Sequence, residues 1–447
     1  MPYLYHTDDD RKEMLDALGI RSEDELFERI PGRYRIEKPL PIGEGKSEYE
    51  TLKYFEALAG RNRPAGGMIS FLGGGIYDHI VPSVVGHLSG RSEFYTAYTP
   101  YQPEVSQGTL QVIFEYQTAV SRLTGLPVAN ASMYDGATAL AESALMAAKI
   151  TKRGTLLCAE TINPRYRDVL KTYAVGQDLK LKTIPHTERG DIDTGALRDL
   201  LAGDVAAVVL QTPNYFGVIE CPWEYRKLIR EAGALLVVAV DPISLSLLKA
   251  PGDYDADIAV GEGQGLGNEM NYGGPLLGFM ACKNEYVRNL PGRLVSETTD
   301  VDGKRAYVLT LQTREQHIRR EKATSNICTN QGLVALRAAI YLSVLGDAGF
   351  HELGGICHDK ALRLARTISL CKGYSIRFSG PFFREFVVHC PAAADAVVKK
   401  ASAEGVLAGI PLEKYFGSNF RNDLLVAVTE KRSDSDFEKL CSILKTV

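Results

Sequence analysis

Two groups of residues in the middle of the chain could bind a ligand with a phosphate and a ring nitrogen. The segment Ser132–Ala139 precedes the alanine-rich helical pattern Leu140–Lys149, so the backbone around Ser132, Asp135 and Gly136 could form an anion site at a helix start. Asp135 could equally be a plain N-cap. Asp241 ends the most apolar predicted strand, where ligands of open α/β sheets bind, although an ordinary acid is as common there.

Together these features resemble the fold-type I pyridoxal phosphate enzymes, in which a helix start takes the phosphate and a strand-end aspartate pairs with the pyridinium nitrogen. A lysine on the loop after the next strand forms the Schiff base in that family. The corresponding loop here, residues 261–270, reads GEGQGLGNEM, and Lys249 and Lys283 lie outside it. We therefore expect no covalently bound cofactor and a degenerate site that comprises Ser132, Asp135, Gly136, Asp241 and Gln264.

Other catalytic and binding motifs are missing from the sequence. The triplet Gly45-Lys46-Ser47 lacks the glycine that a phosphate loop needs at position 40. The glycines after position 260 do not fit a dinucleotide fingerprint, and no G-x-S-x-G elbow occurs. Histidines and cysteines never stand in ligand spacing, so no metal site is predicted. The eight scattered cysteines suit buried thiols in a reducing cytoplasm, which is the predicted location.

The elements that would position these residues alternate between strands and helices. Near-continuous apolar strands separated by amphipathic helices indicate a parallel sheet covered on both faces. The fold class is therefore α/β, doubly wound and mostly parallel, with a small C-terminal α+β domain. Predicted strands are 155–159, 179–184, 205–210, 235–241, 258–261 and 276–281 in the large domain, and 374–378, 386–389 and 424–428 in the small one. Predicted helices are 164–174, 194–201, 223–232, 331–345 and 359–370.

The predicted domains are an N-terminal helical arm over residues 1–65, a large α/β domain over 66–345 and a small domain over 346–447. Capping boxes at Thr7, Ser22 and Ser47 announce the short helices of the arm. The 447 residues carry 51 basic and 55 acidic side chains, a net charge of −4, and no basic stripe. Nucleic acid and membrane are therefore not expected as partners, and a small molecule or a protein is favoured.

Longer strings are more specific, and they resemble the glycine dehydrogenases (decarboxylating), the P-proteins of the glycine cleavage system, in their two-chain form. The resemblance covers essentially the whole chain. In the two-chain form, this chain corresponds to the N-terminal subunit. The strings are FLGGGIYDH at 71–79, YTAYTPYQPEVSQGTLQ at 95–111, ASMYDG at 131–136 and REKATSNICT at 320–329. In that family the Schiff-base lysine belongs to the partner chain, in agreement with its absence from this sequence.

The resemblance implies a shared reaction. Pyridoxal phosphate would be held by subunit 2, in a complex of two plus two chains. Glycine would lose CO2, and the aminomethyl group would pass to the lipoyl arm of the H-protein, the reaction of EC 1.4.4.2, with this chain active only beside its partner. Residues expected to complete the pocket or an interface are Tyr95, Tyr98, Thr99, Tyr101, Gln102 and Glu104. Thr324, Ser325 and Asn326 could reach the partner's cofactor phosphate or simply cap a helix.

Two alternatives remain open at this stage. One is a self-sufficient enzyme of the aminotransferase type, which would need a lysine that the pattern does not reveal. The other is a scaffolding or regulatory subunit that touches neither substrate nor cofactor. The histidines His79 and His87 are more typical of satisfied structural residues than of proton-transfer groups.

Overall fold

The computed structural model describes residues 5–36, 38 and 41–447. The chain divides after Arg63 into an N-terminal unit and a unit that runs from Pro64 to Val447. Residues 1–4, 37, 39 and 40 of the predicted arm lie outside the described residues.

The N-terminal unit contains two α-helices, α1 (Asp8–Leu18) and α2 (Glu48–Ala59). Both begin with the predicted capping box, formed by Thr7 with Asp10 and by Ser47 with Glu50. The box predicted at Ser22 is wrong, because that hydroxyl makes no cap bond and a short 3₁₀ turn follows it. None of the described residues of this unit (5–36, 38 and 41–63) is buried, so they form no core.

A seven-stranded mixed sheet forms the centre of the second unit, in the order β2-β8-β7-β6-β5-β3-β4. The pairs from β4 to β7 are parallel, and β8 runs antiparallel to β7 and to β2. All six predicted strands of this domain are present, because each is an almost unbroken run of buried apolar residues except the edge strand β4. The strands are β2 (Val128–Ala129), β3 (Thr155–Ala159), β4 (Lys180–Ile184), β5 (Val205–Thr212), β6 (Leu235–Val240), β7 (Ile258–Glu262) and β8 (Gly278–Cys282).

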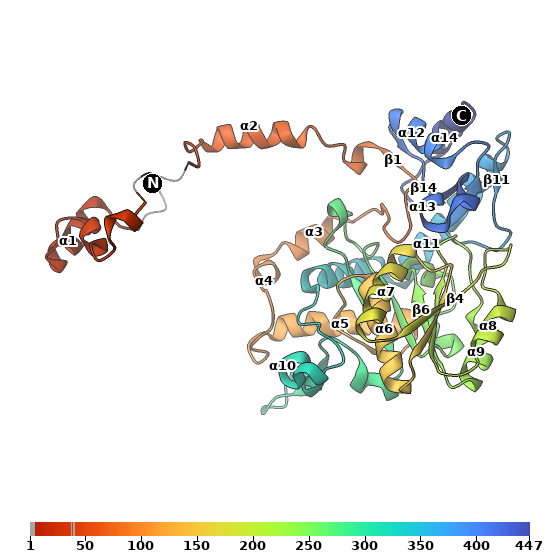
Figure 1. The fold of residues 1–447 in the computed structure, drawn as a ribbon, viewed down its shortest axis with the longest axis horizontal. Coiled ribbons are helices and arrows are strands. Elements are labelled where there is room, and N and C mark those ends of the chain that lie inside the picture. Colours follow the sequence, from red (N-terminus) through yellow and green to blue (C-terminus); the bar gives the residue numbers. More distant parts are fainter. Residues whose placement is uncertain (1–4, 37, 39–40) are drawn as a thin grey trace. The chain divides into compact units, whose positions relative to one another are not determined.

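Helices flank this sheet on both sides (Figure 1). The buried helix α6 packs against β7 and β8, and α9 packs against β6. The helices are α3 (Ser83–Ser89), α4 (Ser92–Tyr95), α5 (Gln107–Thr124), α6 (Gly136–Thr151), α7 (Pro164–Gly176), α8 (Thr194–Leu200), α9 (Pro222–Glu231) and α10 (Gln316–Arg319). A hairpin of β9 (Val295–Thr299) and β10 (Arg305–Leu309), for which the sequence analysis made no prediction, packs against α5.

The C-terminal region forms a four-stranded antiparallel sheet in the order β11-β12-β15-β14. Its members are β11 (Ser375–Ile376), β12 (Glu385–His389), β14 (Ile410–Pro411) and β15 (Asp423–Ala427), with α12 (Ala394–Ala403), α13 (Glu413–Phe416) and α14 (Asp434–Leu444). A strap from the start of the unit joins this region, because β1 (Ile69–Ser70) pairs in parallel with β13 (Val406–Leu407). The strap then continues through Gly73–Gly75 toward the large sheet, so it connects both sheets.

The helix α11 (Gly332–Ser369) links the two sheets. Gly346, the first residue of the predicted small domain, interrupts it with φ 59° and ψ −174°. By length and composition this helix could cross a membrane. Helix α11 packs against α5, α3 and α14, as a core helix does. Core helices can have the same length and apolar composition as helices that cross a membrane.

We predict that Gly217→Ala destabilises the protein strongly. Gly217 has φ 83°, and a Cβ there would lie 1.9 Å from the backbone oxygen of Glu385 in β12. We expect a loss of about 3 kcal/mol or more in the free energy of unfolding, measured by urea denaturation. Gly203→Ala is the matched control, because Gly203 has φ 95° with open space around its Cβ, and strain alone is worth about 1 kcal/mol. Equal losses in both variants would contradict the steric argument.

Candidate functional site: a filled crevice and an open groove

The predicted anion site at the start of α6 is already filled by the protein. Asp135 is the N-cap, and its side chain accepts the N–H of Thr138 at 2.7 Å. The next N–H, of Gly136, donates to Glu262 Oε2 at 2.9 Å. A carboxylate from the end of β7 therefore occupies the place where the resemblance puts a phosphate.

Glu262 is held by two further backbone groups. Its Oε1 accepts the N–H of Gln264 and the N–H of Leu277, each at 2.9 Å. Burial raises the pKa of this carboxyl to about 7, although the N–H groups of Leu277, Gly136 and Gln264 lower it. Three donors converge on one buried carboxylate, so the side chain is fixed in position.

Asp241, which was predicted to pair with the pyridinium nitrogen of the cofactor, is bonded to groups of the protein. Its Oδ2 lies 2.7 Å from Nη2 of Arg384, and its Oδ1 accepts the N–H of Ile243 at 3.1 Å. Arg384 precedes β12 and is only 2% exposed. Its guanidinium lies 3.6 Å from the ring centre of Tyr77, so it is paired on one side and stacked on another.

The strap, residues 69–79, covers one side of the crevice between the two sheets, which Glu262, Asp241 and Glu385 line. The N–H of Gly74 donates to Glu385 Oε1 at 2.7 Å, and the hydroxyl of Tyr77 donates to Glu385 Oε2 at 2.8 Å. Gln264, from the degenerate set, accepts the N–H of Tyr77 at 2.9 Å. Burial raises the pKa of Glu385 to about 7, opposed by Gly74 and by the neighbouring Arg384. A Cβ on Gly73 would meet Glu385 Oε1 at 2.2 Å, which explains the glycine there.

A third group, His79, Cys357 and Glu430, brings potential metal ligands within 4.8 Å of one another. Both ring nitrogens of His79 are used, because Nδ1 lies 2.7 Å from Glu430 Oε2 and Nε2 accepts from Arg384. Burial raises and His79 lowers the pKa of Glu430, with a net result of about 2. The cluster therefore continues the ion-pair network, and the nearby guanidinium cation opposes a metal ion.

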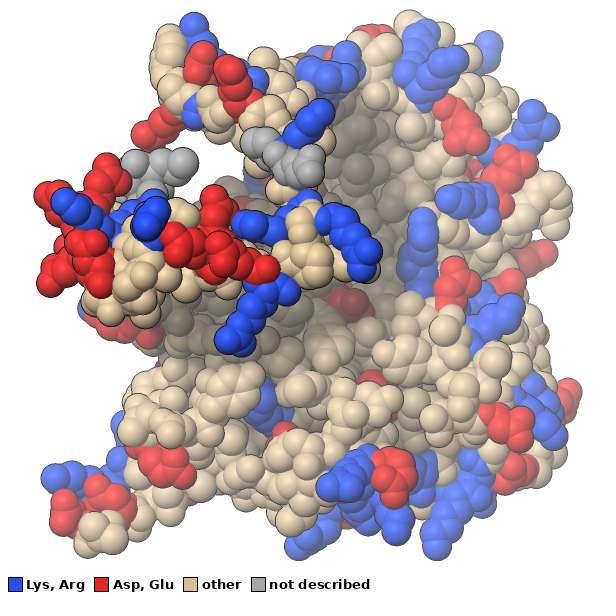
Figure 2. Space-filling view, turned by 60° about the vertical axis from the view of Figure 1, so that its left-hand side comes forward, with Lys and Arg blue, Asp and Glu red and all other residues tan. Residues whose placement is uncertain are grey.

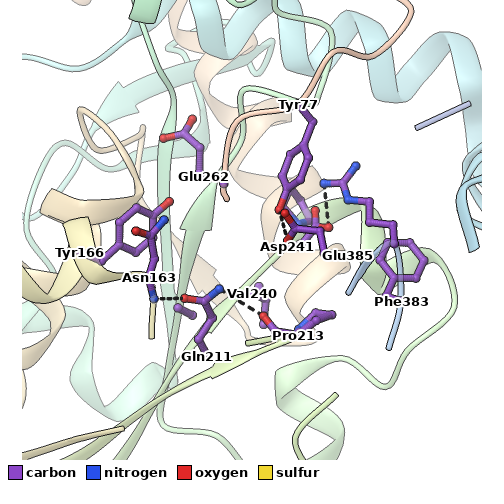
Figure 3. A pocket seen from close by; sticks show the side chains of 14 residues that line it. Tyr77, Asn163, Tyr166, Gln211, Pro213, Val240, Asp241, Glu262, Phe383 and Glu385 are labelled. Carbon is purple, nitrogen blue, oxygen red and sulfur yellow. Dashed lines mark hydrogen bonds and ion pairs between the residues drawn. The ribbon is translucent and has the colours of Figure 1, made fainter. Parts of the chain in front are cut away.

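These residues do not fit pyridoxal phosphate. Glu262 and Tyr166 face the crevice from one side, and Asp241, Tyr77 and Glu385 face it from the other (Figure 3). The cavity between them is about 30 Å³, enough for two or three water molecules at about 10–15 Å³ each. The two flanking lysines are committed elsewhere, since Lys249 lies over the Trp223 ring at 5.1 Å and Lys283 pairs with Asp257 at 2.7 Å.

Ser132 has a structural contact in place of a ligand. It is buried with φ 137°, and its hydroxyl accepts the N–H of Gln331 at 2.9 Å. The degenerate site that the sequence analysis predicted is therefore a set of satisfied side chains. Sequence reasoning missed Glu262, Arg384 and Glu385, because their partners are 126, 143 and 311 residues away.

A second, open cavity brings together residues from both other predicted sets. Thr99, Tyr101 and Asn326 line a groove of about 740 Å³. The groove also contains three basic side chains that the sequence analysis did not single out, Arg293, His317 and Arg320. Arg320 opens the REKATSNICT string, which could have pointed to it, whereas nothing in the sequence marked Arg293. The side of the unit that carries α4 and α10 faces the viewer in Figure 2 and shows a broad area without charged side chains.

The other predicted residues lie outside this groove or are held by neighbours. Tyr95 and Tyr98 are 68% and 79% exposed. Glu104 lines a separate depression beside the β9–β10 hairpin, and the backbone oxygen of Gln102 accepts the N–H of Val105. Among the second set, Thr324 receives a bond from Lys149, and Ser325 donates to the buried Glu142 at 2.8 Å. Only part of each predicted set therefore shares one cavity.

The groove presents the guanidinium groups of Arg293 and Arg320 beside aromatic and amide groups, and the carboxylates of Glu315 and Glu321 line it as well. Arg293 donates to the backbone oxygen of Cys328 at 2.9 Å and to Asn330, so it braces the segment that carries Asn326. Arg320 has φ 53° and ψ −128°, a rare conformation for a residue with a side chain. Guanidinium forks favour carboxylate and phosphate ligands.

Comparison with known proteins agrees with the fold and with the resemblance. A family model described as "Glycine cleavage system P-protein" matches residues 1–444. The chain is 48% identical over 447 residues, all of both chains, to "Probable glycine dehydrogenase (decarboxylating) subunit 1" of Moorella thermoacetica. It is 49% identical over 444 residues, 99% of each, to the protein of the same description from Chlorobium limicola.

Solved structures agree with the family match and with the fold. A glycine decarboxylase (P-protein) of the glycine cleavage system, in inhibitor-bound form, matches with a TM-score of 0.89 and 43% identity over 100% of both chains. A Lactobacillus brevis glutamate decarboxylase, at 11% identity, matches 93% of this chain and 95% of its own with a TM-score of 0.67, a likeness of fold alone. The predicted fold-type I architecture is confirmed, and the chain belongs to the P-protein family of the glycine cleavage system.

Proposed function

We propose that this chain is the subunit of a two-chain glycine decarboxylase that carries no Schiff-base lysine. With a lysine-bearing partner, it decarboxylates glycine and passes the aminomethyl group to the lipoyl arm of the H-protein in the cytoplasm. The observation that carries this proposal is the filled crevice. A chain similar to proteins described as glycine dehydrogenase (decarboxylating) subunit 1 has a cavity of about 30 Å³ where the fold holds its cofactor.

The partner would then hold pyridoxal phosphate, which, when bound, withdraws electrons from the α-carbon of an amino acid. The part of this chain is to supply one wall of that site. Its groove offers the hydroxyl of Tyr101, the amide of Asn326 and the guanidinium groups of Arg293 and Arg320. These groups can orient an anionic substrate or hold a phosphate while the groove walls exclude water.

Exposed aromatic rings support an interface next to this groove. Tyr98 and Tyr101 lie with ring centres 6.3 Å apart and are each more than three-quarters exposed. In the N-terminal unit, Tyr49, Leu52 and Phe55 of α2 are also more than half exposed. Large exposed aromatic residues are typical of surfaces that a partner covers. A complex of two plus two chains would bury both sets.

We predict that the purified chain alone does not exchange the carboxyl of glycine with labelled CO2, because it has no amine placed to hold the cofactor. Addition of the lysine-bearing partner restores exchange. Exchange by the chain alone, or a borohydride-trapped cofactor adduct on one of its lysines, would favour the self-sufficient enzyme and contradict the proposal.

We predict that Tyr101→Ala and Arg320→Ala each lower the exchange rate of the reconstituted complex by about 10- to 100-fold, because misplaced binding groups have effects of this size. Arg366→Ala is the matched control, since Arg366 is exposed on α11 outside the groove. Gel filtration verifies that the chains still assemble. Full exchange by both groove variants in an intact complex would instead indicate a scaffolding subunit.

A further inference from the structure

The crevice contains a matched pair of opposite charges at its two ends. At the α6 end, Glu262 accepts three backbone N–H groups at 2.9 Å. At the β6 end, Arg384 pairs with Asp241 at 2.7 Å. A bound pyridoxal phosphate would present the same two charges, an anionic phosphate and a cationic ring nitrogen.

The negative end has the properties of a working anion site. Gly136 is the first residue of a 16-residue helix, where the backbone N–H groups and the helix dipole favour negative charge. Glu262 is 7% exposed and Gln264 is 1% exposed, so little bulk solvent reaches the carboxylate. Without it, the N–H groups of Gly136, Gln264 and Leu277 would be buried without a partner, which is unfavourable.

The positive end joins the two sheets. Asp241 follows β6 of the large sheet, and Arg384 precedes β12 of the small sheet. Arg384 also stacks on Tyr77 of the strap and bonds to His79. Removal of either partner of such a pair leaves an uncompensated buried charge.

We propose that Glu262 and Arg384 are built-in replacements for the two charged ends of the cofactor: Glu262 fills a phosphate site that the fold has retained, and Arg384 neutralises Asp241 and ties the two sheets together. The site at the start of α6 is thus a latent site for inorganic phosphate or a phosphate monoester. The proposal concerns this chain by itself and does not depend on the partner subunit.

The test compares the melting temperature of the full chain in sodium phosphate and in sodium chloride of equal ionic strength. Phosphate stabilises folded proteins in general relative to chloride, and the shift of the wild-type melting temperature between the two salts measures that general effect. Glu262→Ala melts lower than the wild type in chloride and gains at least about 2 °C more in phosphate than the wild type does, because an anion that binds only the folded state raises its stability. No gain, or an equal gain in the wild type, would overturn the phosphate site.

A matched control is Glu220→Ala. Glu220 is 1% exposed and accepts the N–H of Ile192 and the amide of Asn214, and neither donor is a backbone N–H from the first turn of a helix. We expect this variant to lose stability and to gain no more in phosphate than the wild type does. An equal phosphate gain in Glu220→Ala would show a general salt effect and also overturn the proposal.

The positive end has its own test, which applies even where Glu262→Ala does not fold. Asp241→Asn removes the carboxylate that Arg384 contacts at 2.7 Å and lowers the melting temperature. The double variant Asp241→Asn, Arg384→Met removes both charges and melts above Asp241→Asn. A double variant that loses the sum of the two single losses would contradict the role given to Arg384.

Discussion

The ion pair between Arg384 and Asp241 is the interaction on which the arrangement of this chain depends. The side chains of Arg384 and Asp241 are only 2% and 12% exposed. The pair connects the end of β6, at the carboxyl edge of the large sheet, to the start of β12 in the small sheet. A buried pair is favourable only when its remaining hydrogen-bonding capacity is satisfied. His79 and Ile243 satisfy part of that capacity, and the Tyr77 ring stacks on the guanidinium, so the strap and both sheets meet at one charged centre.

In this chain the crevice and the open groove have different roles: the crevice stabilises the fold, and the groove is a surface for a partner. The crevice at the sheet edge is filled by the protein's own side chains and contributes to stability. The groove beside Tyr101 and Arg320 is open and bordered by exposed aromatic rings, as a surface that serves a partner would be. We propose that this chain keeps the fold of a cofactor enzyme because its own charged side chains replace those of the ligand.

The sequence predicted the elements that local patterns determine. Strands such as Leu235–Val240 are continuous buried runs, and the N-caps at Thr7, Ser47 and Asp135 are formed within four residues. The prediction at Ser22 was wrong because its first turn is 3₁₀. The pairing of β1 with β13, the bond of Glu262 to Gly136 and the ion pair of Arg384 with Asp241 join residues more than a hundred positions apart, and no local pattern encodes such contacts.

The central claim is that this chain holds no cofactor and that its partner holds all of it. The most direct measurement is the ratio of pyridoxal phosphate to protein in the purified complex, determined from alkali-released cofactor absorbance and total chain concentration. The account predicts one cofactor for each pair of unlike chains, with every borohydride-labelled peptide from the partner. Two cofactors per pair, or a labelled peptide from this chain, would contradict it.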